Sequence, residues 1–337
     1  MNSPRRNYRF FIVVCLVLCA LAAACGASGA RQTPSPSQIR KQGRAAPTPR
    51  PEERAAYGPP ARLGEFGDDA VDESSGVAAS RANAGLYWTH NDTGDGPFLY
   101  AFDRQGAKRG VWRVAGAKAE DWEDMAAGPG PERGRTYLYI GDIGDNDYVR
   151  GSVVVYRVPE PTVTGEDAES SKKRARETAP AEAIMLKYPD GAHDAETLLV
   201  HPQTGDLYIV LKSLDPAAGV YKLAAPFDST KTHTLARVGE VRAPGAPFGG
   251  FFTGGAVSPD GTRLVLCDYI HAYEMTLPAG APAFDAVWKQ PMLVVDLGER
   301  KHGEAVTYGP DGDTILATNE GRHGAIAEVK RQAGSRQ

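Results

Sequence analysis

The sequence predicts an all-β fold, a β-propeller of four-stranded antiparallel blades, on three observations. From residue 61 onward the apolar runs are short, alternate with period two and end in Gly, Pro, Asp or Asn, which is the pattern of strands and turns. These runs recur in five modules with a period of tens of residues. The fifth module is one run short, and the unassigned run ARLGEFG at 61–67 precedes the first module. We therefore expect this N-terminal strand to close the ring.

The modules align on the turn proline that ends the first run in four of them. The first runs are DESSGVAASRANAG, DWEDMAAGPG, DAETLLVHPQTG, FFTGGAVSPDG and HGEAVTYGPDG. The second runs are LYWTHND, YLYIGDIGDN, LYIVLKSLD, RLVLCDYIH and TILATNEGRH. A β-sandwich would also have many short strands, but it would not explain why acidic first strands recur with a proline six residues on. The sequence therefore favours the propeller.

The number of blades follows from the number of modules, and five is the expectation. A sixth blade is possible if the segment 160–180 hides one. Its mixture of acidic and basic residues is more typical of a solvated insertion. We expect the propeller to cover residues 61–332, with a short tail at 333–337.

The N-terminus has the pattern of an export signal. Arg5, Arg6 and Arg9 precede the apolar stretch FFIVVCLVLCALAAAC, which ends in small residues. This is typical of a signal peptide over residues 1–25, and the apolar run is too short to favour a permanent spanning helix. Residues 26–60 are rich in Ala, Pro, Ser, Gln and Arg without apolar periodicity, which predicts a flexible tether.

The cysteines favour a lipid anchor. The sequence LAAAC at residues 21–25 resembles the lipobox of bacterial lipoproteins, in which the cysteine is lipidated. Three of the four cysteines lie in the signal region, so the body of the protein, with Cys267 alone, has no internal disulfide. We therefore expect lipidation at Cys25 and attachment to the bacterial cell envelope. Ordinary secretion with an incidental Cys25 is the alternative.

Composition limits the classes of partner. The formal net charge is -4 and no clustered basic face is present, which argues against binding to nucleic acid. With 337 residues and 42% hydrophobic content, the chain can bury a sizeable core. We expect a monomer whose partners are the membrane, through its anchor, and a small-molecule or protein ligand.

Acidic residues recur where the blades begin. The first strand of each blade lines the central channel of a propeller, and residues two apart on a strand share a face. Six residues before the turn proline stand Ser75, Glu123, Glu196, Thr253 and Glu304, with Ser75 placed by analogy. Two residues earlier stand Glu73, Asp121, Asp194, Phe251 and His302. We expect two stacked rings at one end of the channel, which we call the mouth.

The second strands run back toward the same end and contribute further polar residues. The expected ligand-binding residues are Glu73, His90, Asp92, Asp142, Asp145, Lys212, Tyr269, His302 and Glu320. So many carboxylates in a confined space either raise one another's pKa or bind a cation. Oxygen ligands without cysteine favour a hard cation such as Ca²⁺, with Glu123, Asp194, Glu196 and Glu304 as the expected metal ligands.

Two alternatives to a calcium site remain open at this stage. His90, His193 and His302 could recruit a transition metal, although no zinc-type spacing supports it. In the second alternative, the carboxylates accept hydrogen bonds from neighbouring backbone or from Lys212 and only join the blades.

The predicted function is an envelope-anchored propeller whose acidic mouth binds a cation and, through it, a small ligand or a partner. The alternative is a metal-dependent hydrolase of a phosphate ester, lactone or glycoside. In that case Asp121, Glu123, Glu196 and Glu304 would divide into acid, base and metal-holding roles. Whether the protein is an enzyme stays open. Ser75 and Ser258 lack the GxSxG context, so a serine nucleophile is not expected.

The motifs ESSG, WTHNDTGD, DWED, GDIGDN, VYRVPEP, YPDGAHDAE, SPDG and HGEA resemble a family of uncharacterised bacterial exported propeller proteins, many of them lipoproteins. The resemblance covers about residues 65–330 and implies the fold and export, without a reaction. Relatives tend to have an acidic residue where this chain has Ala256, which puts the fourth blade's share of a site in doubt. Calcium-dependent propeller phytases, lactonases and five-bladed glycosidases are similar more distantly, at the level of fold alone.

Overall fold

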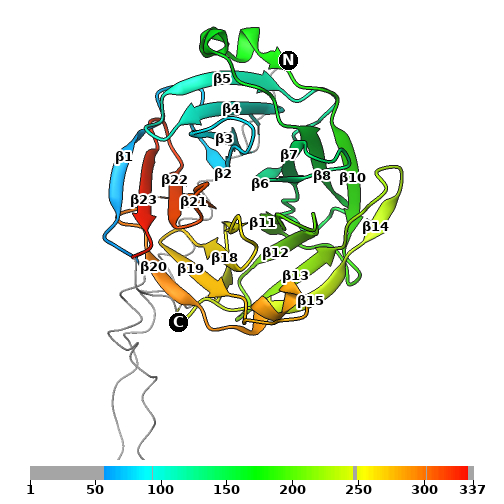
Figure 1. Ribbon diagram of the computed structural model, residues 1–337. Helices are drawn as coiled ribbons and strands as arrows, with labels where there is room; N and C mark the ends of the chain where they lie inside the picture. Colours follow the sequence, from blue (N-terminus) through cyan, green and yellow to red (C-terminus); the bar gives the residue numbers. More distant parts are fainter. Residues whose placement is uncertain (1–56, 93, 246–248, 301, 333–337) are drawn as a thin grey trace, which may run out of the picture. The chain divides into compact units, whose positions relative to one another are not determined.

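The computed structural model describes residues 57–92, 94–245, 249–300 and 302–332. They form five four-stranded antiparallel blades around a central axis (Figure 1). The predicted all-β propeller with five blades is confirmed, and these residues contain no sixth blade. The predictions for the signal peptide, for Cys25, for the tether up to residue 56 and for the tail at 333–337 fall outside the described residues. In the part of the chain that is described, no helix has the length and apolarity needed to cross a membrane.

The strands of each blade are given from the axis outward. Blade 1 is β2 (Ser74–Ala79), β3 (Leu86–Asn91), β4 (Phe98–Asp103) and β5 (Lys108–Arg113). Blade 2 is β6 (Trp122–Pro129), β7 (Thr136–Asp142), β8 (Val153–Pro159) and β10 (Glu182–Lys187). Blade 3 is β11 (Ala195–Val200), β12 (Leu207–Ser213), β13 (Ala218–Leu223) and β15 (Ala236–Val241). Blade 4 is β17 (Gly254–Val257), β18 (Arg263–Cys267), β19 (His271–Thr276) and β20 (Leu293–Asp296). Blade 5 is β21 (Gly303–Tyr308), β22 (Thr314–Asn319), β23 (Ala325–Lys330) and β1 (Ala61–Glu65). Short strands β14 (Thr232–Thr234) and β16 (Gly250–Phe251) extend blades 2 and 3.

The first strands pack against one another around the axis, as the ring model requires. Glycine makes two of these contacts possible. A Cβ on Gly76 would lie 2.6 Å from the backbone nitrogen of Met125 in blade 2, and one on Gly254 would lie 2.8 Å from the carbonyl oxygen of Glu304 in blade 5. Both distances are too short for a side chain, so the close approach of blades near the axis depends on these glycines.

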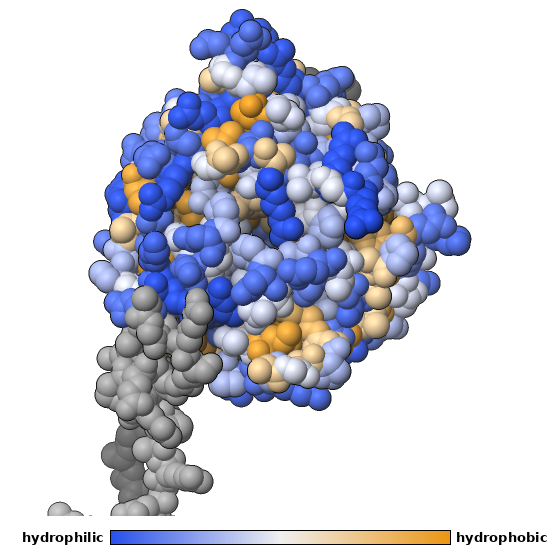
Figure 2. Space-filling model, in the orientation of Figure 1, coloured by the Kyte–Doolittle hydropathy of each residue, from blue (hydrophilic) through white to orange (hydrophobic). Residues whose placement is uncertain are grey.

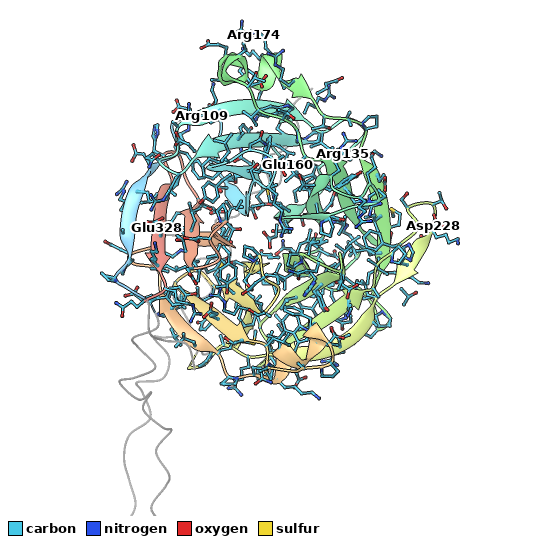
Figure 3. All side chains as sticks on the ribbon, in the orientation of Figure 1. Arg109, Arg135, Glu160, Arg174, Asp228 and Glu328 are labelled. Atoms are coloured by element: carbon cyan, nitrogen blue, oxygen red, sulfur yellow. The ribbon has the colours of Figure 1, made fainter. Side chains whose placement is uncertain are left out.

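The N-terminal strand closes the ring, as predicted. Strand β1 pairs antiparallel with β23, from Ala61 opposite Glu328 to Glu65 opposite Ala325 (Figures 1 and 3). The described residues begin before β1 at Tyr57, which bridges to Arg331 and whose hydroxyl donates to Glu274 Oε1 at 2.6 Å. Glu274 belongs to blade 4 and is 1% exposed in its side chain. The arm therefore joins blade 5 to blade 4 as well as completing blade 5.

The segment 160–180 crosses the outer edge of blade 1. It contains two 3₁₀ turns, η2 (Gly165–Glu169) and η3 (Lys172–Arg174), and strand β9 (Arg176–Glu177), which pairs in parallel with β5. Most of its side chains are exposed, and Figure 3 shows Arg174 at the outer tip. It is nevertheless attached, because the Val111 N–H donates to Ser170 Oγ at 2.7 Å.

The core lies in the seams between blades. Between blades 1 and 2, the rings of Trp88 and Trp112 meet edge to face with centroids 5.0 Å apart, and Trp122 and Tyr156 extend the same cluster. A carboxylate that sequence reasoning missed, Glu160, lies at this seam (Figure 3). It is 8% exposed and accepts hydrogen bonds from Trp88 Nε1 at 2.9 Å, from Thr136 Oγ1 at 2.8 Å and from the Ala82 N–H at 3.1 Å.

Candidate functional site

Of the five positions six residues before the turn proline, two hold uncharged residues, Ser75 and Thr253, which join neighbouring blades. The Ser75 hydroxyl of blade 1 donates to the carbonyl oxygen of Glu123 in blade 2. The Thr253 hydroxyl donates in the same way to the carbonyl oxygen of Glu304 at 3.0 Å, from blade 4 to blade 5. Both residues are buried. The blade-joining role therefore belongs to the hydroxyls, and the carboxylates of Glu123, Glu196 and Glu304 have different surroundings.

Three carboxylates from two blades converge at the start of β6. Ligand oxygens of Asp92, Asp121 and Glu123 all lie within 4.8 Å of one another. Glu123 is 3% exposed, and the other two are half-buried. Gly144 of the GDIGDN stretch closes one side, because a Cβ there would overlap Glu123 Oε1 and lie 2.5 Å from Asp121 Oδ2. The donor set is carboxylate oxygen alone, which suits a hard cation.

The loop after β7 positions these carboxylates. Asp142 accepts hydrogen bonds from the Glu120 N–H at 3.1 Å and the Asp121 N–H at 3.2 Å, and forms an ion pair of 2.8 Å with Arg150. Asp145 accepts from the backbone of the same loop, from the Val149 N–H and the Arg150 N–H, each at 2.9 Å. Asp142 and Asp145 were expected to bind ligand, and the structure places both in the support of the loop.

The third blade contributes a buried ion pair. Lys212 Nζ, near the end of β12, donates to Glu196 Oε1 on the adjacent strand β11. The ammonium also lies 4.9 Å from the ring centroid of Phe251, in the short strand β16, and 5.7 Å from that of Tyr269, which follows β18 of blade 4. Glu196 is 7% exposed, and its Oε2 has no hydrogen-bond partner among the described residues. A buried carboxylate oxygen without a partner is costly and marks a position where a ligand could bind.

Burial shifts the protonation of the mouth carboxylates. It raises the pKa of Glu196 to about 8, although the charge and hydrogen bond of Lys212 oppose the shift. It also raises the pKa of Glu123 and Glu304 well above the ordinary value, and in both cases the Glu196 charge is the next cause. For Glu320, burial followed by the charges of Asp92 and Glu73 raises the pKa to about 7. Without a cation, burial and mutual repulsion therefore favour the protonated forms of these carboxyls.

The histidines have separate environments. His90 is fully buried in the seam of blades 1 and 2, with Nδ1 2.9 Å from the Asn91 carbonyl oxygen and its ring edge-on to Trp122. Burial lowers the pKa of its imidazole, so the ring is neutral. His193 Nε2 lies 2.9 Å from Asp190 Oδ1, and His302 is exposed with a φ of 56°. The three side chains expected in the transition-metal alternative thus have different surroundings.

The remaining predicted residues lie at the rim or in its support. Glu73 is exposed, and burial followed by the charge of Asp92 raises its pKa. Asp194 is 5% exposed and accepts the Asp145 N–H at 2.9 Å. Hydrophilic residues cover most of the face shown in Figure 2, including the region around its centre.

Sequence reasoning missed a fully buried carboxylate that bonds to three blades. Asp124 is 0% exposed, and its Oδ2 accepts from the Leu198 N–H of blade 3 at 3.0 Å and the Gly255 N–H of blade 4 at 3.3 Å. Its Oδ1 accepts from the Met125 N–H at 2.7 Å. The register of β6 shifts between Trp122 and Asp124, so strand alternation does not apply across Glu123. Asp124 joins blades 2, 3 and 4, whereas Glu123 lies with Asp92 and Asp121 at the mouth.

A scan against protein-family models and a search of curated proteins found no match. Among solved structures, the chain is similar to the gluconolactonase XC5397 of Xanthomonas campestris, with 10% identity and a TM-score of 0.39, over 82% of this chain and 98% of that one. It is also similar to the Dos1 propeller, with 7% identity and a TM-score of 0.36, over 80% and 95% of the two chains. Similarity at this level supports no statement about activity.

Proposed function

We propose that the mouth binds a divalent cation, Ca²⁺ in the first place, and through it a small ligand. The observation that carries the proposal is the convergence of Asp92, Asp121 and Glu123 from two blades. Calcium takes 6–8 oxygen ligands in irregular geometry, so three carboxylates leave coordination positions for water or for a ligand. The proposed metal ligands differ from those expected from the sequence, because Asp194 and Glu196 have partners in Asp145 and Lys212.

Charge balance supports the same proposal. The mouth carries Glu73, Glu320 and Glu304 beside the three converging carboxylates, whereas Lys212 is already paired with Glu196. Repulsion among these groups is among the causes that raise the pKa of Glu123 and Glu304. A bound cation would remove that repulsion and favour the ionised forms.

Calcium titration of the full chain tests the proposal. Calorimetry should show binding to the wild-type protein, and the melting temperature should rise, because a ligand bound only by the native state stabilises it by about 2.7 kcal/mol at a hundredfold excess over Kd. Asp121→Asn should lose both responses. Asp215→Asn, which makes the same change at an exposed position of the β12–β13 loop, should keep them. A wild-type protein that gives no heat and no change in melting temperature with Ca²⁺ would refute the proposal.

We also propose that the propeller is held at the cell envelope by a lipid on Cys25, and that it acts there as a monomer. The support is the order of a charged segment, an apolar run and LAAAC in residues 1–25. A lipid anchor restricts the ligand to molecules outside the cytoplasm.

Hydrolysis of a lactone, phosphate ester or glycoside is the second candidate, and the protonation of Glu196 favours it. A carboxyl with a pKa of about 8 is protonated at neutral pH and can donate a proton to a leaving group. Calcium-loaded protein should then turn over a substrate of one of these classes, and Glu196→Gln should lose turnover while Ca²⁺ binding persists. Absence of turnover in all three classes, with Ca²⁺ bound, would leave the binding function alone.

A further inference from the structure

A tyrosine recurs at one register position of the third strand in four blades. In each blade its partner on the second strand directly precedes the residue that faces Gly76, Asp124, Thr197 or Gly254 of the first strand. The pairs are Tyr100 with Thr89, Tyr156 with Ile140, Tyr221 with Ile209, and Tyr273 with Leu266. In blade 5 the corresponding pair is Ala327 with Ala317. The fifth blade therefore lacks the ring that the other four have.

In the other blades the tyrosine ring is buried and its hydroxyl has a partner near the mouth end of the blade. Tyr100 donates to Asp95 at 2.8 Å, Tyr221 to Asp190 at 2.7 Å and Tyr273 to Asp268 at 2.6 Å. Tyr156 accepts from the Lys118 N–H at 3.2 Å. Asp190 and Lys118 lie in connections from the preceding blade. The ring thus fills a seam, and the hydroxyl meets a polar group of a loop.

Blade 5 has a cavity at this place. Its volume is about 360 Å³, and its walls include Ala317, Ala325 and Ala327 on blade 5. Leu297, Gly298 and Arg300 of the connection from blade 4 line the opposite side, with Pro60 and Arg62 of the N-terminal arm at the edge. Cavities of about 300 to 1,000 Å³ are typical of small-molecule sites. This cavity is lined by none of the carboxylates of the mouth.

Arg300 gives the cavity a positive charge. Its guanidinium donates to Asn319 Oδ1 at 3.3 Å and to the carbonyl oxygens of Asp268 at 3.2 Å, Thr318 at 3.0 Å and Ala305 at 3.4 Å. These bonds use four of the five N–H donors of a guanidinium, so one on Nη1 is left. All four acceptors are neutral, and no carboxylate of the described residues forms an ion pair with Arg300.

The other two charged residues at the cavity, Arg62 and Glu299, do not neutralise Arg300. Arg62, at the edge, pairs with Glu65 at 3.0 Å. Glu299 also lines the cavity, but it is exposed, and no ion pair joins it to Arg300. The alanine side chains of the wall are apolar, and the remaining N–H of Arg300 can donate to an anionic oxygen.

We propose that the seam between blades 4 and 5 binds a small aromatic anion. Its ring takes the place of the missing tyrosine against Ala317 and Ala327, and a carboxylate or phenolate oxygen accepts from Arg300. The site is separate from the mouth, and the proposal does not depend on a cation.

Calorimetry with 4-hydroxybenzoate on the full chain, in the presence of EDTA, tests the proposal. The wild-type protein should bind it. Cyclohexanecarboxylate, which has the charge without the planar ring, and phenol, which has the ring without the carboxylate, should each bind at least tenfold more weakly. If 4-hydroxybenzoate gives no heat at millimolar concentration, or if cyclohexanecarboxylate binds equally well, the proposal is wrong.

Two variants locate the site. Ala327→Tyr restores the recurring tyrosine and should abolish binding, with a melting temperature equal to or above that of the wild type. Arg300→Gln should weaken binding at least tenfold, whereas Arg135→Gln, at an exposed arginine (Figure 3), should not change it. Arg300 also donates to three carbonyl groups, so its substitution could disturb the fold. The binding constant of Arg300→Gln is therefore compared with that of the wild type only if the variant still melts cooperatively. Ala327→Tyr does not touch these bonds, and unchanged binding in that variant overturns the assignment.

Discussion

Lys212 Nζ donates to only one oxygen of Glu196, and the second oxygen, Oε2, is buried without a partner among the described residues. Glu196 is also, after burial, the main cause of the raised pKa of Glu123 and of Glu304. The charge of one incompletely paired carboxylate therefore adds to the effect of burial on the pKa of its two neighbours. The mouth of the metal-free protein should respond to pH in a way that can be measured.

Between pH 6.5 and 8, the stability of the protein in EDTA should fall as the pH rises. The pKa of Glu196 is raised to about 8 and that of Glu320 to about 7, whereas both groups titrate near 4.5 in the unfolded chain. The native state thus binds more protons in this window, and the free energy of unfolding declines until the carboxyls have ionised. Thermal melts should show a falling melting temperature, and Glu196→Gln should make the slope shallower.

His90 opposes this decline below about pH 6.5. Burial lowers the pKa of its imidazole, so there the unfolded chain binds a proton at this residue that the native state lacks, which offsets part of the effect of the carboxyls. Added Ca²⁺ should flatten the decline above pH 6.5, because the cation favours the ionised carboxylates. A wild-type melting temperature that rises from pH 6.5 to 8 in EDTA would contradict the proposed protonation of the mouth.

Asp124→Asn should destabilise the propeller by about 2 to 3 kcal/mol, because it leaves buried N–H groups without an acceptor. Burial raises the pKa of Asp124, but its three contacts, from Met125, Leu198 and Gly255, are all N–H donors and favour the carboxylate. An asparagine would turn its own N–H₂ group toward one set of these donors. Urea denaturation would measure the loss, with Asp215→Asn as the control. A loss under about 0.5 kcal/mol would show that the axis tolerates a neutral amide.

The fold could be predicted because its signals are local and repeated. The period of two, the turn prolines and the unpaired run at 61–67 are all read along the chain, and the pairing of β1 with β23 follows from counting strands. The two rings at the mouth stay a prediction, because they rest on strand alternation and the register shifts at Ser75, Glu123, Glu196 and Glu304. What could not be derived is the partner of each side chain. Ser75 and Glu123 occupy equivalent positions, yet one donates to a neighbouring blade and the other faces the mouth.

The missed residues show the same limit. Glu160 and Asp124 are bonded by groups far away in the chain, such as Trp88 for the first and Gly255 for the second, so their roles depend on tertiary packing. The loss of a tyrosine in the fifth module is visible in the third runs, FLYAFD, VYRVP, GVYKL and AYEMTL against AIAEVK. The cavity it leaves depends on where the connection carrying Arg300 crosses the seam.

Deletion of residues 57–67 should destabilise the propeller far more than deletion of 30–50. The first deletion removes β1, exposes the edge of β23 and breaks the hydrogen bond from Tyr57 to Glu274. The second removes residues of the predicted tether and none of these contacts. Melting temperatures of the two purified variants decide the matter. Equal values would mean that the closing strand is dispensable.

Cys25→Ser should release the protein from membranes without changing its melting temperature. Each acyl CH₂ buried in a bilayer contributes roughly 0.8 kcal/mol, so the acyl chains of a lipid anchor decide partitioning. The Pro- and Ala-rich residues 26–60 supply no comparable apolar surface. Membrane fractionation with labelled palmitate measures both sedimentation and lipid incorporation, and Cys267→Ser is the matched control, since that thiol is buried in the propeller. A Cys25→Ser protein that still sediments with membranes, together with a wild type that never incorporates palmitate, would exclude the anchor. The ligand of the mouth would then have to be sought among molecules that meet a freely diffusing protein.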